Sequence, residues 1–250
     1  LILIGFFTFW FFDDLNIQGL YCDVALVGNA ALGSFKNLNY NLNSHRAILG
    51  GRIPLMVNDY NAATDIYAAV PWVYFLGNNP LALNIPGFIW GSLSIVALYM
   101  TLMQLYNSKL YTLMVSSMLV SSPAFIVSAR LGSFTGVLTI FFVLIAVFSL
   151  LQWRKRGLTL WLFIMGLSMG IGIAGKIQIL WFINAMLIYS IFTGSLGKGR
   201  MFLKHIAILF MGMVFGAFSL ILANIKEGFF TLKFLARYSI ISRSGIPNIC

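Results

Sequence analysis

Charged side chains are scarce in this sequence. Only 9% of its 250 residues are Asp, Glu, Lys or Arg, whereas 60% are hydrophobic. Soluble domains carry about 25% charged residues, so this chain has too little polar surface to face water on all sides. The scarcity excludes a soluble globular protein and predicts that lipid surrounds most of the molecule.

Cysteine and histidine are also nearly absent, with two of each in the chain. No Cys/His cluster has the spacing of a metal site, so the sequence supports neither a zinc centre nor another divalent metal. The run from Gly170 to Gly175 matches the spacing G-x-G-x-x-G. It lies inside an apolar segment with no preceding strand, so we do not assign dinucleotide binding to it. We expect no nucleotide cofactor and no nucleic-acid partner; a divalent metal stays open, without support from the sequence.

Long apolar runs dominate what remains. A spanning helix needs about 20 apolar residues, and the first run, Leu1 to Phe12, is shorter than that. We expect it to be the end of a truncated first helix. The fold class predicted is all-α, a polytopic transmembrane bundle of about seven helices. The other six runs are Leu81–Tyr106, Leu110–Ser128, Phe134–Trp153, Leu158–Gly175, Ile177–Phe192 and His205–Ile225.

Polar segments divide this single domain, residues 1–250, into three parts. Residues 13–80 form a large first loop, 81–225 the transmembrane core, and 226–250 a basic tail. Within the loop, Ala62 to Leu76 is apolar but short and contains Asp65 and Pro71. These features favour an interfacial helix that lies along the membrane over a helix that spans it.

Short basic loops predict the orientation. Lys109, the Arg154–Arg156 run and the segment with Lys198, Arg200 and Lys204 all fall on one side. Basic short loops face the cytoplasm, so the first loop and the tail face outward. We expect an integral membrane protein, in the plasma membrane if the cell is prokaryotic.

The outer side then holds an excess of ionisable groups. All six acidic residues and nine of the 16 basic residues fall there. Basic residues in such number on the outer face indicate an anionic ligand, although contacts with lipid headgroups would also account for them.

Two pairs of glycines, Gly166 with Gly170 and Gly212 with Gly216, have the spacing G-x-x-x-G. In membrane helices this spacing is typical of close helix packing. We therefore expect these two helices to approach other helices closely at the glycines.

Several segments of the chain, taken in order, resemble one family. They are Gly19–Ala31, Gly51–Ala63, the stretch from Tyr67 to Gly77, Ser122-Pro123, Ser128-Ala129-Arg130 and Gly175-Lys176. This order is similar to that of the GT-C membrane glycosyltransferases. Within them it most resembles the dolichyl-phosphate-mannose protein mannosyltransferase and aminoarabinose transferase group, glycosyltransferase family 39 and relatives.

The resemblance implies roles for particular residues. Asp23 stands at the position of the family's first acid and would be the catalytic base, while Val24 stands where the family often has Glu. The acid that the family often has near Arg130 is missing from residues 130–134. The residues expected to bind the substrate, with its lipid phosphate, are Arg52, Arg130, Lys176, Tyr60 and Asp59.

Each role has a structural alternative. Asp23 is also a good N-cap for a helix that begins near Val24. Arg52 and Arg130 are long enough to reach lipid headgroups, and Lys176 would anchor a helix end at the membrane boundary. Asp59 and Asp65 are typical loop or capping residues.

The function implied is transfer of a sugar from a polyprenyl-phosphate donor, with inversion, on the outer face. The partners would be that donor, the lipid bilayer and an acceptor protein, lipid or glycan. Two other functions remain open: a transporter or lipid flippase, and an inactive protein that binds polyprenyl phosphate.

Overall fold

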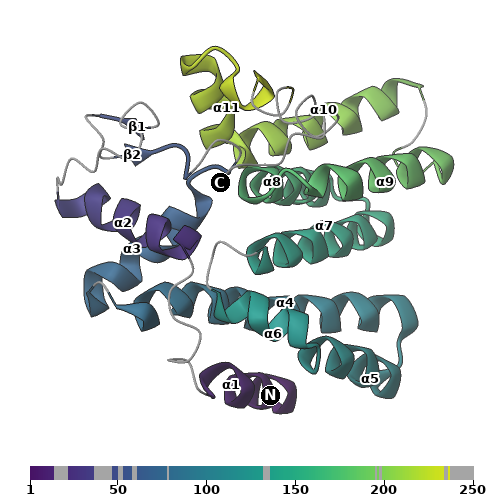
Figure 1. The fold of residues 1–250 in the computed structure, drawn as a ribbon. Coiled ribbons are helices and arrows are strands. Elements are labelled where there is room, and N and C mark those ends of the chain that lie inside the picture. The colour runs from purple at the N-terminus through teal and green to yellow at the C-terminus, as the bar shows by residue number, and fades with distance from the viewer. Residues whose placement is uncertain are drawn as a thin grey trace, which may run out of the picture.

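The fold is an all-α bundle, as the sequence predicts. The structure, a computed structural model, describes residues 1–13, 22–36, 47–49, 53–57, 61–77, 79–131, 136–194, 196, 199–233 and 236, with the backbone alone at 22, 23 and 34–36. From α1 at the bottom, the bundle rises through α5 and α6, then α4, α7 and α8 with α9, to α10 and α11 at the top (Figure 1). The bundle helices are α1 (Ile2–Phe12), α4 (Pro80–Tyr106), α5 (Lys109–Val120), α6 (Pro123–Arg130), α7 (Val137–Arg156), α8 (Thr159–Gly175), α9 (Ile179–Phe192), α10 (Gly199–Gly216) and α11 (Phe218–Lys226).

Three helices among the described residues are long and apolar enough to cross a membrane. They are α4, α7 and α10, with 27, 20 and 18 residues. Helices α5 and α6 form a fourth candidate, bent by 59° between them. Together with the shorter apolar helices α1, α8 and α9, they confirm the expectation of a helical membrane bundle.

Two of the predicted runs are broken in the structure. The run Leu110–Ser128 divides into α5 and α6 at Ser121 and Ser122. Pro123 explains this break, because proline lacks a backbone N–H and disfavours helical geometry in the residue before it. The run His205–Ile225 divides into α10 and α11 at Ala217.

Helices α8 and α10 pack at their glycines. A Cβ atom added to Gly166 would lie 2.0 Å from the carbonyl oxygen of Leu209, and one on Gly170 would lie 2.2 Å from that of Met213. The same is true in reverse, since a Cβ on Gly216 would lie 2.3 Å from the oxygen of Leu167. These contacts confirm the close packing predicted from the G-x-x-x-G pairs.

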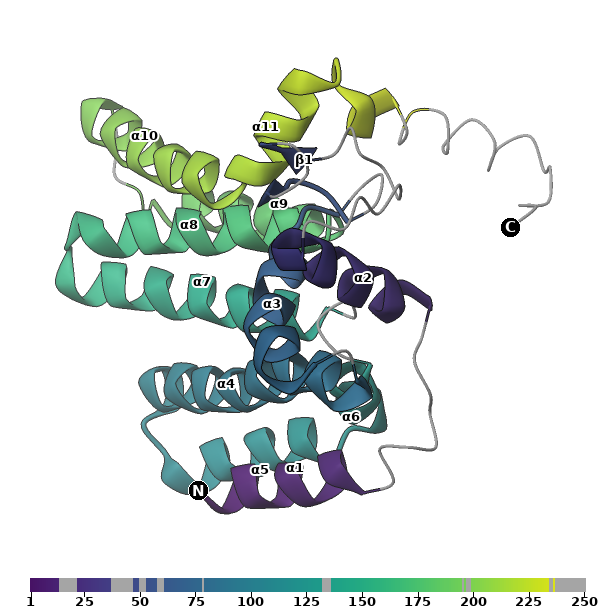
Figure 2. The same ribbon diagram turned by 90° about the vertical axis from the view of Figure 1, so that its left-hand side faces the viewer.

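The first loop supplies two helices and a short hairpin. Helix α2 (Cys22–Lys36) packs on α3 (Thr64–Leu76), and strands β1 (Ala47–Ile48) and β2 (Ile53–Pro54) pair antiparallel. All of them lie at the same end of the long helices (Figure 2). We call this the first-loop end of the bundle; Lys109 and the Arg154–Arg156 run lie at the opposite end, where α4 stops and α7 stops.

Candidate active site

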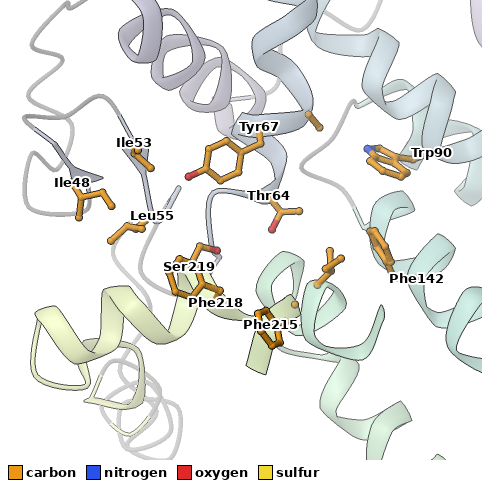
Figure 3. Close-up of a pocket in the computed structure, with 13 residues that line it drawn as sticks. Ile48, Ile53, Leu55, Thr64, Tyr67, Trp90, Phe142, Phe215, Phe218 and Ser219 are labelled. Carbon is orange, nitrogen blue, oxygen red and sulfur yellow. The ribbon is translucent and has the colours of Figure 1, made fainter. Parts of the chain in front are cut away.

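A cavity of about 500 Å³ lies at the first-loop end, between α3 and the bundle. Helix α3 contributes Thr64, Tyr67 and Ala68 to its wall (Figure 3). Most of the rest of the lining is apolar and comes from the hairpin and from α4, α7, α8, α10 and α11. It includes Ile48, Ile53, Leu55, Trp90, Phe142, Ile171, Phe215 and Phe218. An apolar wall of this kind suits a hydrocarbon chain.

Hydrogen bonds hold α3 and the hairpin at this place. The backbone N–H of Ala62, just before α3, donates to the carbonyl of Ala174 in the last turn of α8 at 2.8 Å. The Tyr67 hydroxyl donates to the carbonyl of Pro54 in β2 at 2.5 Å. The ammonium of Lys226, at the end of α11, donates to the carbonyl of Ala47 in β1 at 2.8 Å. The cavity wall is therefore joined to α8 and α11.

Asp65 lies in the first turn of α3 and is almost fully buried, with 2% of its surface exposed. It does not cap the helix, because the N-cap is Ala63 and no side chain makes a capping bond there. Its Oδ1 atom has no hydrogen-bond partner among the described residues. Burial raises the pKa of the Asp65 carboxyl well above its usual value, and the nearby charge of Lys176 partly offsets that rise.

Lys176 occupies the turn between α8 and α9, in an extended backbone conformation. Its side chain passes along Gly136, since a Cβ on Gly136 would lie 3.7 to 3.9 Å from Cδ, Cε and Nζ of Lys176. Gly136 is the N-cap of α7 and offers no capping side chain. The first N–H groups of a helix lack intrahelical partners and carry partial positive charge. The ammonium and the α7 terminus together therefore create a strongly positive potential, which favours an anion.

Thr139, also in the first turn of α7, adds a polar atom to this region. Its Oγ1 is buried without a hydrogen-bond partner among the described residues. A Cβ on Gly175, next to Lys176 in the chain, would lie 3.5 Å from it. We call Asp65, Gly136, Thr139 and Lys176 the Lys176 cluster.

The cluster lies close to the apolar cavity. Phe142 and Ile171 line the cavity; Phe142 is five residues from the start of α7, and Ile171 is four residues from the end of α8. At 1.5 Å per residue, these separations are about 7.5 Å and about 6 Å along the helix axes. A charged end and an apolar chamber are therefore neighbours, an arrangement that suits a lipid with an anionic head.

Arg130, one of the predicted phosphate ligands, lies at the end of α1. Its Nε donates to the carbonyl of Phe11 at 3.2 Å, and Nη2 donates to the carbonyls of Trp10 and Asp13. These carbonyls belong to the C-terminal turn of α1, which has no further helix to satisfy them. The contacts give Arg130 a structural role, and its phosphate role stays a prediction.

The other predicted site residues are only partly described. Asp23 is the second residue of α2, so it lies inside the first helical turn, and its side chain is outside the described residues. Arg52, Tyr60 and Asp59 lie outside the described residues altogether. Of the predicted set, the structure therefore describes the surroundings of Arg130 and Lys176, which contact the end of α1 and Gly136 respectively.

Sequence reasoning missed the parts that Asp65 and Thr139 play in the cluster. One signal for Asp65 was present, because an acidic residue within an apolar stretch at a membrane marks a candidate functional site. Thr139 carried no such signal, since hydroxyl residues are common in membrane helices.

Comparison with known protein families identifies the family of this chain. The model of the dolichyl-phosphate-mannose-protein mannosyltransferase family matches residues 69–223, which is more than half of the chain. Comparisons with curated proteins and with solved structures give no match. The matched region includes Thr139 and Lys176 and all the helices from α4 to α10. The chain therefore belongs to the dolichyl-phosphate-mannose-protein mannosyltransferase family, and it is an integral membrane glycosyltransferase of the GT-C type.

Proposed function

We propose that this glycosyltransferase moves a sugar from a polyprenyl-phosphate donor to an acceptor on the outer face, by inverting displacement. The observation that carries the proposal is the position of Lys176. Its ammonium lies against the N-terminus of α7, which has no side-chain cap, and it is close to the apolar cavity. This pairing of a positive end with an apolar chamber matches the two halves of a polyprenyl phosphate.

The cavity would hold part of the isoprenoid chain. Its aromatic and aliphatic wall offers apolar surface to a hydrocarbon, and its aromatic side chains are those of Tyr67, Trp90, Phe142, Phe215 and Phe218. Each buried methylene contributes about 0.8 kcal/mol to binding when water is excluded. The chain would thus hold the donor, while the phosphate sets its position.

The leaving group is the polyprenyl phosphate, whose negative charge grows as the bond from the anomeric carbon to the phosphate oxygen breaks. Fixed positive groups stabilise such a transition state more than the ground state. Lys176 and the first N–H groups of α7 would supply that stabilisation. Arg52, in the first loop, would be a second cation for the same phosphate.

Asp23 would act as the general base. An ordinary aspartate has a pKa of about 3.9, so it is ionised near neutral pH and can accept the proton of the acceptor hydroxyl. The hydroxyl oxygen attacks the anomeric carbon from the face opposite the phosphate, which inverts the configuration. Helix α2 packs on α3, so the backbone of Asp23 belongs to the first-loop end, as the cavity does.

Transfer of radiolabel from a polyprenyl-phosphate mannose donor tests the proposal, with the purified protein in lipid nanodiscs and an extract of membrane acceptors. We expect wild type to transfer label and Asp23→Asn to lose at least a hundredfold in kcat, since a positioned base contributes about 10²–10⁴. Lys155→Gln is the control, because Lys155 is exposed at the opposite end.

Equal transfer by wild type and Asp23→Asn would remove the base assignment. Absence of transfer by wild type, with the donor still bound, would favour a protein that binds polyprenyl phosphate without turning it over. The lack of acids at Val24 and in residues 130–134 is the observation that keeps this second function in view.

A further inference from the structure

Asn184 is a polar side chain on the outward face of an apolar helix. It lies in the middle of α9, and its side chain is exposed. On the other side of α9, Ile179, Ile183 and Met186 are buried in one cluster with side chains of α7 and α8. Within the described part of the chain, the Asn184 amide has no side-chain hydrogen bond. The bundle therefore leaves this amide turned away from its own core.

The depth of Asn184 in the membrane follows from the two ends of α9. Near the first-loop end, a Cβ on Gly172 would lie 2.2 Å from Cδ1 of Ile179, so these residues are at one level. At the opposite end, Nη1 of Arg154 donates a hydrogen bond to the Tyr189 hydroxyl at 2.6 Å. Asn184 is five residues from Ile179 and five from Tyr189, which is about 7.5 Å along the axis in each direction. Its amide therefore lies at the depth of the lipid chains.

An amide at this depth is unfavourable if only lipid surrounds it. Hydrocarbon offers no hydrogen bond to replace those that water makes with the amide. Lysine and arginine are long enough to reach back to the headgroups, but asparagine has a single methylene and is too short. In membrane bundles, asparagine side chains form hydrogen bonds across helices instead. The position of Asn184 therefore requires a polar group on a neighbouring helix.

The side chains around Asn184 form a surface that fits another helix. Trp181, Asn184, Ile188 and Ile191 follow one another at intervals of three, four and three residues. This is the spacing of the a and d positions of a coiled coil, where one asparagine fixes the register and the number of helices. The three hydrophobic members are 81%, 54% and 58% exposed. We call these four residues the α9 seam.

A second copy of this chain is the partner that the α9 seam fits. An asparagine amide has both an N–H donor and a carbonyl acceptor. In a dimer with a two-fold axis, both copies contribute the same surface, so two Asn184 amides can donate to each other. The seam has no charged residue, so no repulsion between like charges opposes this contact.

We propose that two copies of the protein pair through the α9 seam, with the two Asn184 amides hydrogen-bonded to each other. The inference goes beyond the proposed function and does not depend on it, because α9 contributes no residue to the described lining of the cavity. The partner recognised is a second membrane-embedded copy, and the contact lies within the bilayer.

Subunit counting by single-molecule photobleaching tests the proposal, with labelled protein in liposomes over a range of protein-to-lipid ratios. We expect wild type to form dimers and Asn184→Leu to dimerise about tenfold more weakly, which is about 1.4 kcal/mol and typical of an interhelical hydrogen bond in model peptides. Asn184→Gln keeps the amide and should dimerise more strongly than Asn184→Leu. Met118→Leu is the matched control, because Met118 is 72% exposed on α5; it should dimerise like wild type.

Cross-linking tests the same contact without changing Asn184. After Cys22 and Cys250 are replaced by serine, oxidation of Ile188→Cys in liposomes should join two copies, and oxidation of Met118→Cys should not. Wild-type protein that stays monomeric at every ratio would overturn the proposal, as would equal dimerisation by wild type and Asn184→Leu. Dimers that Ile188→Cys does not cross-link would place the contact on another face and overturn it as well. This second measurement decides the matter if Asn184→Leu does not fold.

Discussion

The carboxyl of Asp65 binds its proton more tightly in the folded protein than in the unfolded chain, because burial disfavours its charged form. The free energy of unfolding is then highest where both states are protonated, below about pH 3.9. The free energy of unfolding falls as the pH rises from about 3.9 to the raised pKa of Asp65 in the folded protein. Above that pKa it no longer changes with the ionisation of Asp65. Lys176 makes the loss smaller, because its charge offsets part of the rise.

Asp65→Asn should remove this pH dependence. The difference in melting temperature between wild type and Asp65→Asn, measured in detergent from pH 4 to pH 8, should shift in favour of the variant as the pH rises. Parallel curves across the whole range would show that the carboxyl has the same pKa in both states.

Arg130→Gln should destabilise the protein. The guanidinium donates to three carbonyls at the end of α1, those of Trp10, Phe11 and Asp13. Loss of hydrogen bonds from a charged donor costs about 1.5–3 kcal/mol each at most, and partial replacement by water reduces the total. We expect a clear fall in melting temperature, with Arg130→Lys in between. A variant as stable as wild type but with weaker donor binding would instead support the phosphate role.

The sequence alone identified Lys176 as a candidate site residue but did not show that Asp65 lies near it. A lysine between two apolar runs is recognised in the sequence, because the residues on both sides of it are apolar. The approach of α3 to the end of α8 depends on tertiary contacts such as the hydrogen bond from Ala62 to Ala174. No local pattern encodes a contact between segments so far apart in the chain.

At the scale of the helices, the close packing of α8 on α10 requires glycine, which has no side-chain carbon, at the points of contact. Gly170→Ala would place a Cβ 2.2 Å from the Met213 carbonyl oxygen, where backbone and not a flexible side chain must move. Overpacking of this kind typically costs about 1–3 kcal/mol. We expect a lower melting temperature for this variant.

Gly5→Ala is the matched control, because a Cβ on Gly5 meets no atom within 4 Å. It should be neutral or slightly stabilising, since alanine favours helix over glycine. If Gly170→Ala were as stable as Gly5→Ala, the close contact between α8 and α10 would be wrong.

Hydrophobic runs predict some helix ends and miss others. The prediction Leu81–Tyr106 matches α4 within one residue, because Pro80 begins the helix and Asn107 ends it. The breaks at Ser121-Ser122 and Ala217 were missed, because hydrophobicity continues through them. The hairpin was missed as well, because strands of two residues have no period to detect.

For the molecule as a whole, the outer location of the first-loop end can be tested by labelling. Single cysteines at Lys155 and Lys233 would be introduced after Cys22 and Cys250 are changed to serine. Both lysines are exposed and lie in regions assigned to opposite sides. A membrane-impermeant maleimide applied to intact cells should label Lys233→Cys and not Lys155→Cys; the reverse pattern would invert the topology.

Composition and apolar runs were enough to predict the class of fold and the order of the helices along the chain. They were not enough to predict the cavity, because its wall combines the hairpin and α3 with residues such as Phe142 and Phe215 on distant helices. A concave surface of this kind is a property of packing, which no single segment carries.

The two sides of the cavity differ in how they are fastened, and this bears on how a membrane lipid would get in. The contact of α10 with α8 is backbone against backbone at glycines, so it resists separation. Helix α11 follows a break at Ala217 and meets the hairpin side through side chains: Lys226 donates to Ala47, and Leu220 and Ala223 pack in one cluster with Leu55 and Met56. Side-chain contacts separate with less rearrangement than backbone contacts. A long-chain donor that enters from the membrane would therefore pass more easily beside α11, where the Lys226 hydrogen bond must open, than between α8 and α10.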